Sequence, residues 1–216
     1  MTYKLFYDQG SAAEGVRVLL EEIGAPYELI PSTKDRSKPR PPEQLAVNPN
    51  GWVPVLLYDG KGMYECAAIT IFLCDRHPEA NLAPAPDDPK RGLFLQTLVY
   101  FSNSVQTGFQ TNYYPDRFVD NAADEPSAQR RGNRRLRETW QVIDDQIGDN
   151  TWVLGDTFSA ADIYLFMLTT WLRPSRGHPK VEEFPNVRRI ADAVEIRPSA
   201  QLVHAEWIAD RDAGLL

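Results

Sequence analysis

The segment from residue 48 to residue 66 restricts the fold more than any other part of this chain. It runs Asn-Pro-Asn-Gly-Trp-Val-Pro-Val-Leu-Leu-Tyr-Asp-Gly to residue 60 and reaches Glu65 and Cys66 soon after. Because Pro54 has no N–H, it fits at the first residue of a strand or at a sheet edge, where a Val-Pro pair is often only an edge device. A cis Val53-Pro54 bond would expose the N–H and C=O of Val53. Such groups can pair with an extended peptide as an added strand does.

The end of the same segment predicts a hairpin that leads into a helix. Asp59-Gly60 suits a tight turn, although Lys61-Gly62 favours a looser four-residue connection. Glu65 and Cys66 then open an apolar helix, whose free N–H groups favour a carboxylate ligand. Glu65 alone could equally serve as a first-turn partner of the helix dipole. Together these features predict a receptor for a short zwitterionic peptide.

A second segment predicts a strand, a loop and a helix between residues 5 and 24. The apolar strand contains Tyr7 and ends in a glycine-containing turn. Apolar residues then recur at helical spacing at positions 16, 19, 20 and 23. Ser11 lies at the expected helix start, where a serine caps the helix by default.

A third segment predicts a buried helix with its own start signal. Ser159 and Asp162 have the spacing of a capping pair, which contributes about 1 kcal/mol for a good cap. The residues that follow are apolar on nearly every side of a helix, so this helix should be buried. We interpret it as a folding element rather than a catalytic one.

The pattern changes along the chain predict two domains. Residues 3 to 77 alternate strands and helices in a β-α-β-α-β-β-α order, and a proline-rich stretch follows. From Arg91 onward only long helical patterns remain, such as 93–110 and 136–147. We therefore expect an α/β domain over 1–80, a linker over 81–91 and an all-helical domain over 92–216.

The three segments together resemble the cytosolic-type glutathione transferases of bacteria, without indicating a subclass. The resemblance covers essentially the whole chain and implies a thioredoxin-like domain followed by the helical domain, with glutathione as co-substrate. In that family the residue before the cis-proline pairs with the cysteinyl part of glutathione, and an acidic residue followed by serine holds the γ-glutamyl end. The resemblance therefore implies glutathione contacts at Ser11, Val53, Pro54, Glu65 and Cys66. Cys66 departs from the usual serine, and a thiol is a weaker donor than a hydroxyl.

The resemblance also places the catalytic group in the first loop. Ser11 is the only hydroxyl or thiol between Tyr7 and the helix body, so we assign it the role of lowering the thiol pKa of glutathione. Tyr7 is the second choice, and a tyrosine in this strand can also simply pack in the core. The cysteine of the beta-like bacterial pattern falls on Ala12, so that chemistry is absent.

The second substrate should lie between the two domains. Polar and aromatic residues mix in the first long helix, and we expect Tyr100, Asn103, Thr107 and Tyr114 to line a pocket in the helical domain for a small electrophile. Trp171 and Arg173 are weaker candidates. An aromatic stripe at helical spacing belongs to a core more often than to a site.

Composition limits the remaining function classes. The formal net charge of −7 argues against a general nucleic-acid or anionic-membrane role, although five arginines cluster between Arg130 and Arg137. They could form a solvated helix face, recruit an anionic substrate or bind a partner subunit. The chain has no signal peptide and no apolar run of membrane-spanning length, so we expect a cytoplasmic protein.

The cysteines and histidines disfavour two further kinds of site. Cys66 and Cys74 lie eight residues apart on one expected helix, about 12 Å of rise, which is too far for a disulfide. The histidines show no ligand spacing, so we expect no metal.

We therefore expect a glutathione S-transferase that joins the glutathione thiolate to a small electrophile, for which an aromatic compound is favoured, with homodimerisation implied by the resemblance. Two alternatives from the same chemistry are a glutathione-dependent isomerase and an ether-cleaving lyase. A non-catalytic glutathione-binding or ligand-binding protein is the alternative from a different class.

Overall fold

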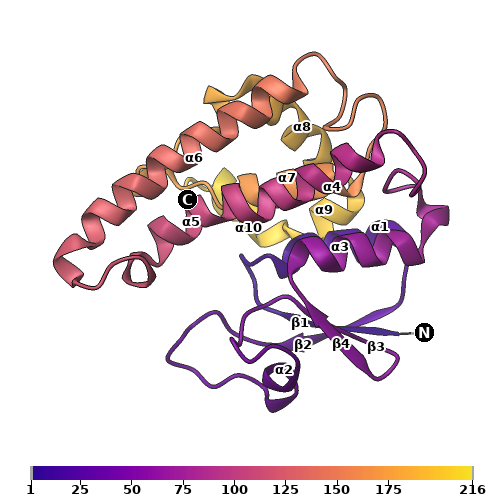
Figure 1. Ribbon diagram of the computed structural model, residues 1–216, viewed down its shortest axis with the longest axis horizontal. Helices are drawn as coiled ribbons and strands as arrows, with labels where there is room; N and C mark the ends of the chain where they lie inside the picture. Colours follow the sequence, from indigo (N-terminus) through magenta and orange to yellow (C-terminus); the bar gives the residue numbers. More distant parts are fainter. Residues whose placement is uncertain (1, 216) are drawn as a thin grey trace.

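The protein, described here by a computed structural model over residues 2–215, consists of a small sheet with helices and a larger helical part (Figure 1). The strands are β1 (Tyr3–Tyr7), β2 (Tyr27–Pro31), β3 (Val55–Tyr58) and β4 (Lys61–Tyr64), in the order β2-β1-β3-β4. β1 pairs parallel with β2 and antiparallel with β3, and β3 pairs antiparallel with β4. The parallel pair requires a crossover, which is the helix between β1 and β2.

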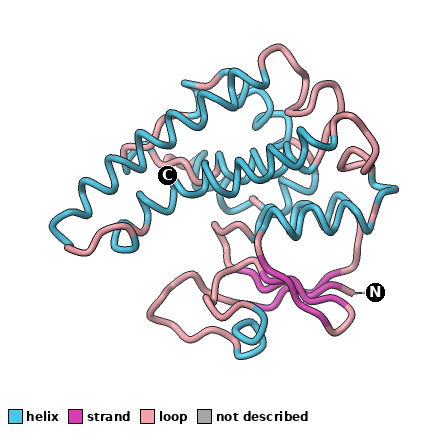
Figure 2. The backbone as a smooth tube through the Cα atoms, viewed as in Figure 1, coloured by secondary structure: helices cyan, strands magenta, loops and turns pink. Residues whose placement is uncertain are grey.

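Three helices accompany this sheet: α1 (Ala13–Ile23), α2 (Pro42–Val47) and α3 (Cys66–Arg76). α1 and α3 lie between the sheet and the helical part, whereas α2 lies on the opposite face of the sheet (Figures 1 and 2). The order of elements is the one that the sequence predicts, and the predicted fold class is confirmed.

The helical part begins with one long rod made of α4 (Arg91–Tyr100), a π-helical turn (Phe101–Val105) and α5 (Gln106–Tyr113). α6 (Glu125–Ile147) packs along α5. Then follow α7 (Ala160–Thr169), α8 (Pro185–Glu195), α9 (Pro198–Val203) and α10 (Ala205–Asp212). Short 3₁₀ turns lie at Pro78–Ala80, Pro115–Arg117, Ala122–Asp124, Pro174–Arg176 and Val181–Glu183.

The core centres on α7, all of whose residues are buried. The predicted capping box is present: the backbone N–H of Ser159 donates to the Asp162 carboxylate at 2.8 Å, and the Ser159 hydroxyl accepts from Ala161 N–H at 3.3 Å. α7 also fixes the position of α1, because a Cβ on Gly15 would lie 2.6 Å from the sulfur of Met167. The two parts of the molecule are therefore joined by direct helix packing.

The expected four-residue hairpin connection is wrong. Tyr58 pairs with Lys61, so Asp59 and Gly60 alone form the turn, with φ of 47° and 71°. Two residues at positive φ suit the turn whose twist matches that of a hairpin. Gly62 lies in β4, where a Cβ would approach the Val47 side chain of α2 to 2.5 Å. That glycine serves the packing of α2 rather than the turn.

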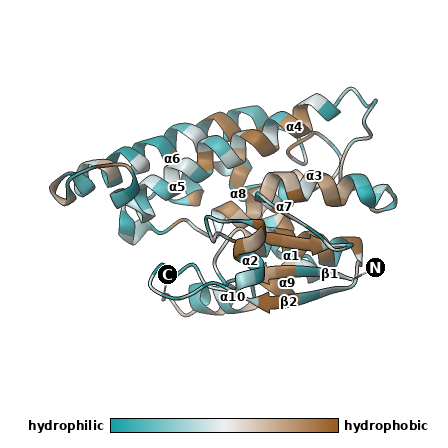
Figure 3. Cartoon of the chain, turned by 60° about the horizontal axis from the view of Figure 1, so that its bottom comes forward, coloured by the Kyte–Doolittle hydropathy of each residue, from teal (hydrophilic) through white to brown (hydrophobic). Residues whose placement is uncertain are grey.

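Hydropathy follows these layers. In Figure 3 the strands are mostly brown, while the long α6 is mostly teal and exposes its polar face to solvent. Over residues 2–215, every helix is either too short or too polar to cross a membrane.

Candidate active site

A cavity of about 790 Å³ lies between the sheet part and the helical part. Its first wall contains the loop after β1, with Gly10 and Ser11, and the residue Val53 before β3. Its second wall comes from α5, the end of α7 and α10, which contribute residues such as Phe109, Trp171 and Trp207. The structure thus brings two distant parts of the chain to one place.

Val53 is held at the cavity by the loop that precedes it. The Val53-Pro54 peptide bond is cis, and Pro54 is buried while Val53 is half-buried. The buried amide of Gln44 donates to the carbonyl of Gly51 at 3.0 Å, and that of Asn48 donates to the carbonyl of Trp52 at 3.1 Å. These side-chain bonds replace a regular ladder in this loop and fix the backbone beside the cavity.

Ser11 lines the cavity but already uses its hydroxyl within the protein. The hydroxyl donates to the carbonyl of Asp8 at 2.5 Å and accepts from the backbone N–H of Ala13 at 3.2 Å. Ser11 therefore ties the loop to the start of α1, as a capping serine would. Its oxygen faces the cavity wall, and its proton goes to Asp8.

Beside Ser11, the buried Glu14 forms a cluster that the sequence reasoning missed. Burial raises the pKa of Glu14 to about 7, against the effects of the Gly10 backbone and of Lys34, Tyr7 and Arg17. His204 Nδ1 lies 3.7 Å from the carboxylate, and burial lowers the pKa of His204 to about 4. Between these values both groups are neutral in the folded protein. The only sequence signal was a glutamate on the apolar side of α1.

Tyr7 is directed toward this cluster and does not line the cavity. The Arg17 guanidinium lies 5.5 Å from its ring centroid. Burial, followed by the charge of Glu14, raises the pKa of Tyr7 to about 12. Its phenol thus stays protonated at any physiological pH.

Glu65 and Cys66 lie at the start of α3, next to the Ser11 loop. Glu65 is exposed and has φ of 75°, a conformation that costs a non-glycine residue about 1–3 kcal/mol and recurs at ligand sites. The Cys66 side chain is buried and donates to the carbonyl of Ala12 at 3.5 Å. Burial raises the pKa of the Cys66 thiol to about 12, and the same holds for Cys74. The Cys66 side chain thus faces the interior, away from any ligand at the helix start.

Of the residues expected in the second-substrate pocket, only Tyr114 lines the cavity. Asn103 is exposed, and Tyr100 lies near Arg135 and Glu138 of α6. Thr107 lines a separate hollow between α5 and α6. Tyr100 and Thr107 thus lie toward α6, whereas Asn103 faces solvent. The residues of α5 that line the cavity are instead Gln106, Phe109, Gln110 and Tyr113.

An arginine that the sequence reasoning did not select completes this wall. The Arg117 guanidinium lies 3.9 Å from the ring centroid of Trp52 and 4.1 Å from that of Tyr114. The next residue back, Asp116, pairs with Arg36 at 2.5 Å and so links the two parts of the molecule. The candidates Trp171 and Arg173 also line the cavity.

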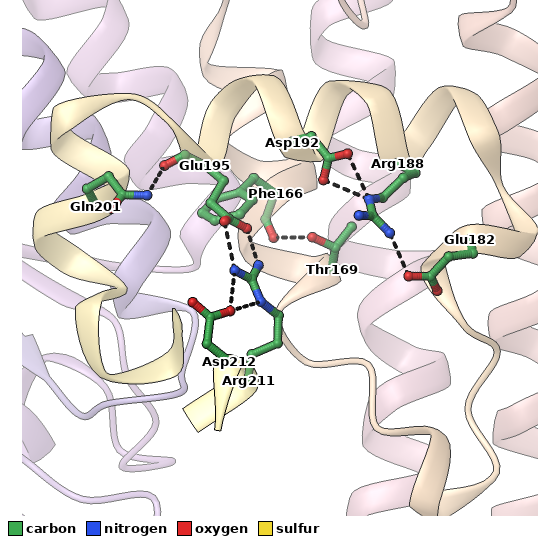
Figure 4. A network of polar contacts seen from close by, with 9 residues as sticks. All are labelled: Phe166, Thr169, Glu182, Arg188, Asp192, Glu195, Gln201, Arg211 and Asp212. Atoms are coloured by element: carbon green, nitrogen blue, oxygen red, sulfur yellow. Dashed lines mark hydrogen bonds and ion pairs between the residues drawn. The ribbon is translucent and has the colours of Figure 1, made fainter. Parts of the chain in front are cut away.

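The C-terminal helix closes the remaining side. α10 contributes Trp207 and Asp210 to the cavity. Figure 4 shows Arg211 of the same helix between two carboxylates, 3.0 Å from Glu195 of α8 and 2.9 Å from Asp212. This ion pair fastens α10 to α8 and so fixes the edge of the cavity.

Among residues 2–215, no three histidine, cysteine or acidic side chains gather as they would around a metal ion. The chemistry that the cavity offers is that of backbone amides, a hydroxyl, a buried carboxyl and several cations.

Two family models match the chain. Residues 11–76 match "Glutathione S-transferase, N-terminal domain", and residues 126–193 match "Glutathione S-transferase, C-terminal domain". The matched ranges include the Ser11 loop, Val53, Glu65 and the capping box before α7.

Individual relatives agree with these matches. Glutathione S-transferase GstA of Escherichia coli O157:H7 is 29% identical over 172 residues, which cover 78% of this chain and 81% of that protein. The maleylacetoacetate isomerase of Pseudomonas aeruginosa is 25% identical over 206 residues, covering 92% and 93%. A glutathione S-transferase of Methylobacterium radiotolerans, solved in complex with glutathione sulfonate, has a TM-score of 0.77 and 28% identity over 93% of each chain.

Proposed function

Because this chain belongs to the glutathione S-transferase family, we propose that it binds glutathione along the first wall of the cavity and transfers it to a small electrophile held by the second. The observation that carries this proposal is the position of Ser11 and Val53 on one wall, opposite an aromatic wall from the helical part. The backbone of Val53 would pair with the cysteinyl part of glutathione, as an added strand would. This arrangement directs the sulfur toward the second wall.

Ser11 is the proposed activator of the sulfur. Its oxygen accepts from the Ala13 N–H, and this bond polarises the hydroxyl and strengthens it as a donor. On binding, the hydroxyl proton would turn from the Asp8 carbonyl to the glutathione sulfur. A donated hydrogen bond stabilises the thiolate and lowers its pKa, and the start of α1 adds favourable N–H dipoles. The thiolate then attacks the electrophile.

The start of α3 is the proposed receptor for the other end of glutathione. The exposed Glu65 carboxylate can pair with the ammonium of the γ-glutamyl group, while the free N–H groups of α3 can donate to the carboxylate of the same group. The backbone N–H of Cys66 serves here, because the Cys66 thiol is turned to the interior. In this assignment the domain over residues 1–80 binds glutathione, and the domain over residues 92–216 holds the electrophile. Residues 81–91 are the linker between the two domains.

A glutathione-dependent isomerase is a second candidate, favoured by the similarity to the maleylacetoacetate isomerase over most of both chains. The same thiolate would add to a conjugated double bond, allow rotation, and leave again. A transferase gives a stable conjugate, whereas an isomerase returns glutathione unchanged, so analysis of the products separates the two.

We further propose that the protein is a cytoplasmic homodimer with a role in detoxification. Large apolar side chains are exposed on β4 and α4, with Tyr64 40%, Leu93 41% and Val99 48% accessible. A second copy is the partner that the family indicates for this surface. Light scattering after size exclusion would test it: a single 24.5 kDa species at micromolar concentration would contradict the dimer.

The central experiment measures the thiolate of bound glutathione by ultraviolet difference spectroscopy as a function of pH. In the wild type we expect a thiolate band well below the pKa of free glutathione, and in Ser11→Ala we expect its loss. Tyr7→Phe is the matched control and should keep the band. Glutathione binding without the band in the wild type would contradict the transferase and favour a carrier.

A further inference from the structure

The cavity carries a charge opposite to that of the whole protein. The net charge of the chain is −7, yet among residues 2–215 the cavity is lined by the cations Lys34, Arg117, Arg173 and Arg176 and by two carboxyls, Glu14 and Asp210. Burial holds Glu14 partly neutral, since its pKa is about 7. A cleft lined by one sign of charge concentrates ligands of the other sign. The cavity therefore favours an anion.

Two of its three arginines are already engaged by the protein. Arg173 donates to the carbonyls of Thr170 and Leu172 at 2.7 and 2.9 Å, and Arg176 donates to the Asn112 side chain at 3.1 Å. Arg117 differs, because its guanidinium donates no hydrogen bond to any residue in 2–215, and its Nη2 is buried without a partner. The buried Nη2 is out of reach of a ligand, but the other N–H groups of this charged side chain are not buried and can pair with an acceptor from outside the chain.

The nearest carboxylate is held away from Arg117. Asp116 pairs instead with Arg36, at 2.5 Å. Burial, followed by the charge of Arg36, lowers the pKa of Arg117 below its usual range. Among residues 2–215 Arg117 thus forms no salt bridge, although the charge of Asp116 acts on it from the next position.

The rings of Trp52 and Tyr114 fix the orientation of this guanidinium. Its central carbon lies about 4 Å from both ring centroids, at 3.9 and 4.1 Å. Contacts with ring faces leave the N–H groups at the edge of the plane as donors, and those of Nε and Nη1, which are not buried, can bind a carboxylate. The neighbouring aromatic side chains suit a flat ligand.

We propose that Arg117 binds the carboxylate of a ligand in this cavity. The carboxylate can belong to the electrophile or to the glycine end of glutathione, and both supply the same planar anion. The identity of the co-substrate rests on the proposed function, whereas the preference for a carboxylate rests on Arg117 alone.

The test compares acids with their neutral amides, so that shape is kept and only charge changes. Calorimetry gives dissociation constants for the unreactive pair 3,5-dinitrobenzoate and 3,5-dinitrobenzamide, and for glutathione and its glycine amide. In Arg117→Gln we expect binding of one of the two acids to weaken about tenfold or more, with its amide changed less than about twofold. The pair that responds identifies the source of the carboxylate.

Three further variants sharpen the result. Arg117→Lys keeps the charge but lacks the planar fork, so it should restore only part of the affinity. Arg36→Gln releases the Asp116 carboxylate beside Arg117 and should also weaken the acid selectively. Arg134→Gln on the exposed face of α6 removes the same charge outside the cavity and should change nothing. Thermal denaturation confirms that each variant is folded.

Equal weakening of acid and amide, or an effect of Arg134→Gln as large as that of Arg117→Gln, would overturn the assignment. The proposed function is judged separately, because these ligands bind without turnover. If the protein prefers the acid but forms no glutathione thiolate, the role of Arg117 is supported and the transferase mechanism is contradicted.

Discussion

The two walls of the cavity bind by different means. In the binding mode proposed above, the first wall offers mainly backbone groups, at Val53 and at the start of α1, with the Ser11 hydroxyl beside them. They are positioned by a two-residue turn and by the buried amides of Gln44 and Asn48. On the second wall the binding groups are side chains, with Arg117 held against Trp52 and Tyr114.

The difference shows where specificity can change in such a molecule. A backbone wall tolerates side-chain substitution as long as the turns and caps remain, so it can keep one ligand. A side-chain wall changes its ligand with each substitution, while the buried α7 behind it preserves the fold. Variants on either side can test this division.

The largest effect should come from Glu14, beneath the first wall. Its pKa is about 7 in the folded protein and 4.5 in the unfolded chain, so the folded state keeps a proton that the unfolded state releases. The stability that Glu14 contributes is complete below pH 4.5, falls as the pH rises, and is lost above about 7. Glu14→Gln does not titrate and should be more stable than the wild type at pH 8, by about 3 kcal/mol.

The measurement is urea denaturation of both proteins from pH 4 to pH 9. His204 has the opposite effect, because the stability that it contributes is lost as the pH falls from 6.5 toward 4. His204 is present in both proteins, so its contribution cancels in the difference between their free energies of unfolding. A difference that does not vary with pH would show that Glu14 is ionised in the folded protein.

Gly132→Ala should damage the second wall and spare the first. A Cβ at this position of α6 would lie 2.8 Å from the carbonyl oxygen of Gly108 and 2.9 Å from the backbone nitrogen of Asn112. Backbone atoms cannot turn aside, so α5 must shift, at a cost of about 2 kcal/mol. We expect KM to rise for the electrophile and to stay nearly constant for glutathione, whereas Gly92→Ala, with open space around its Cβ, should change neither. An equal rise for both substrates would contradict the independence of the walls.

The same division explains what could be predicted from the sequence. The hairpin, the capping box and the succession of strands and helices follow from local rules at Pro54, Asp59-Gly60 and Ser159. The hairpin belongs to the part of the molecule that forms the first wall, and the capping box starts the buried α7. The choice of Tyr100, Asn103 and Thr107 for the second wall rested on the mixture of polar and aromatic residues in the first long helix. Composition does not show which residues of a helix meet α6, which meet solvent and which meet the cavity.

Arg117 shows the limit of local reasoning more clearly. Its contacts join residues 36, 52, 114, 116 and 117, which come together only when the two parts of the molecule pack. No spacing rule connects them. Glu14 was missed for a related reason, since its neutral state depends on burial by α9 and α10.

Arg211→Ala should have a smaller effect, confined to the edge of the cavity. Arg211 joins α10 to Glu195 of α8, and a half-exposed ion pair of this kind contributes about 1 kcal/mol or less. We expect faster hydrogen exchange in α10 and a KM for the electrophile raised about two- to threefold. Arg188→Ala, which breaks an exposed pair with Asp192 within α8, is the control and should leave α10 unchanged. Unaltered exchange in α10 would mean that Trp207 alone holds the helix.

Val53→Ala should have the smallest effect, although Val53 lies at the centre of the first wall. If glutathione pairs with the Val53 peptide, removal of two methyl groups leaves the binding groups in place. We therefore expect the KM for glutathione to change less than about twofold, which corresponds to less than about 0.4 kcal/mol. The comparison is with Arg117→Gln, where loss of a side chain should cost about tenfold. A tenfold loss in Val53→Ala would show that the first wall also depends on its side chains, and the division between the walls would fail.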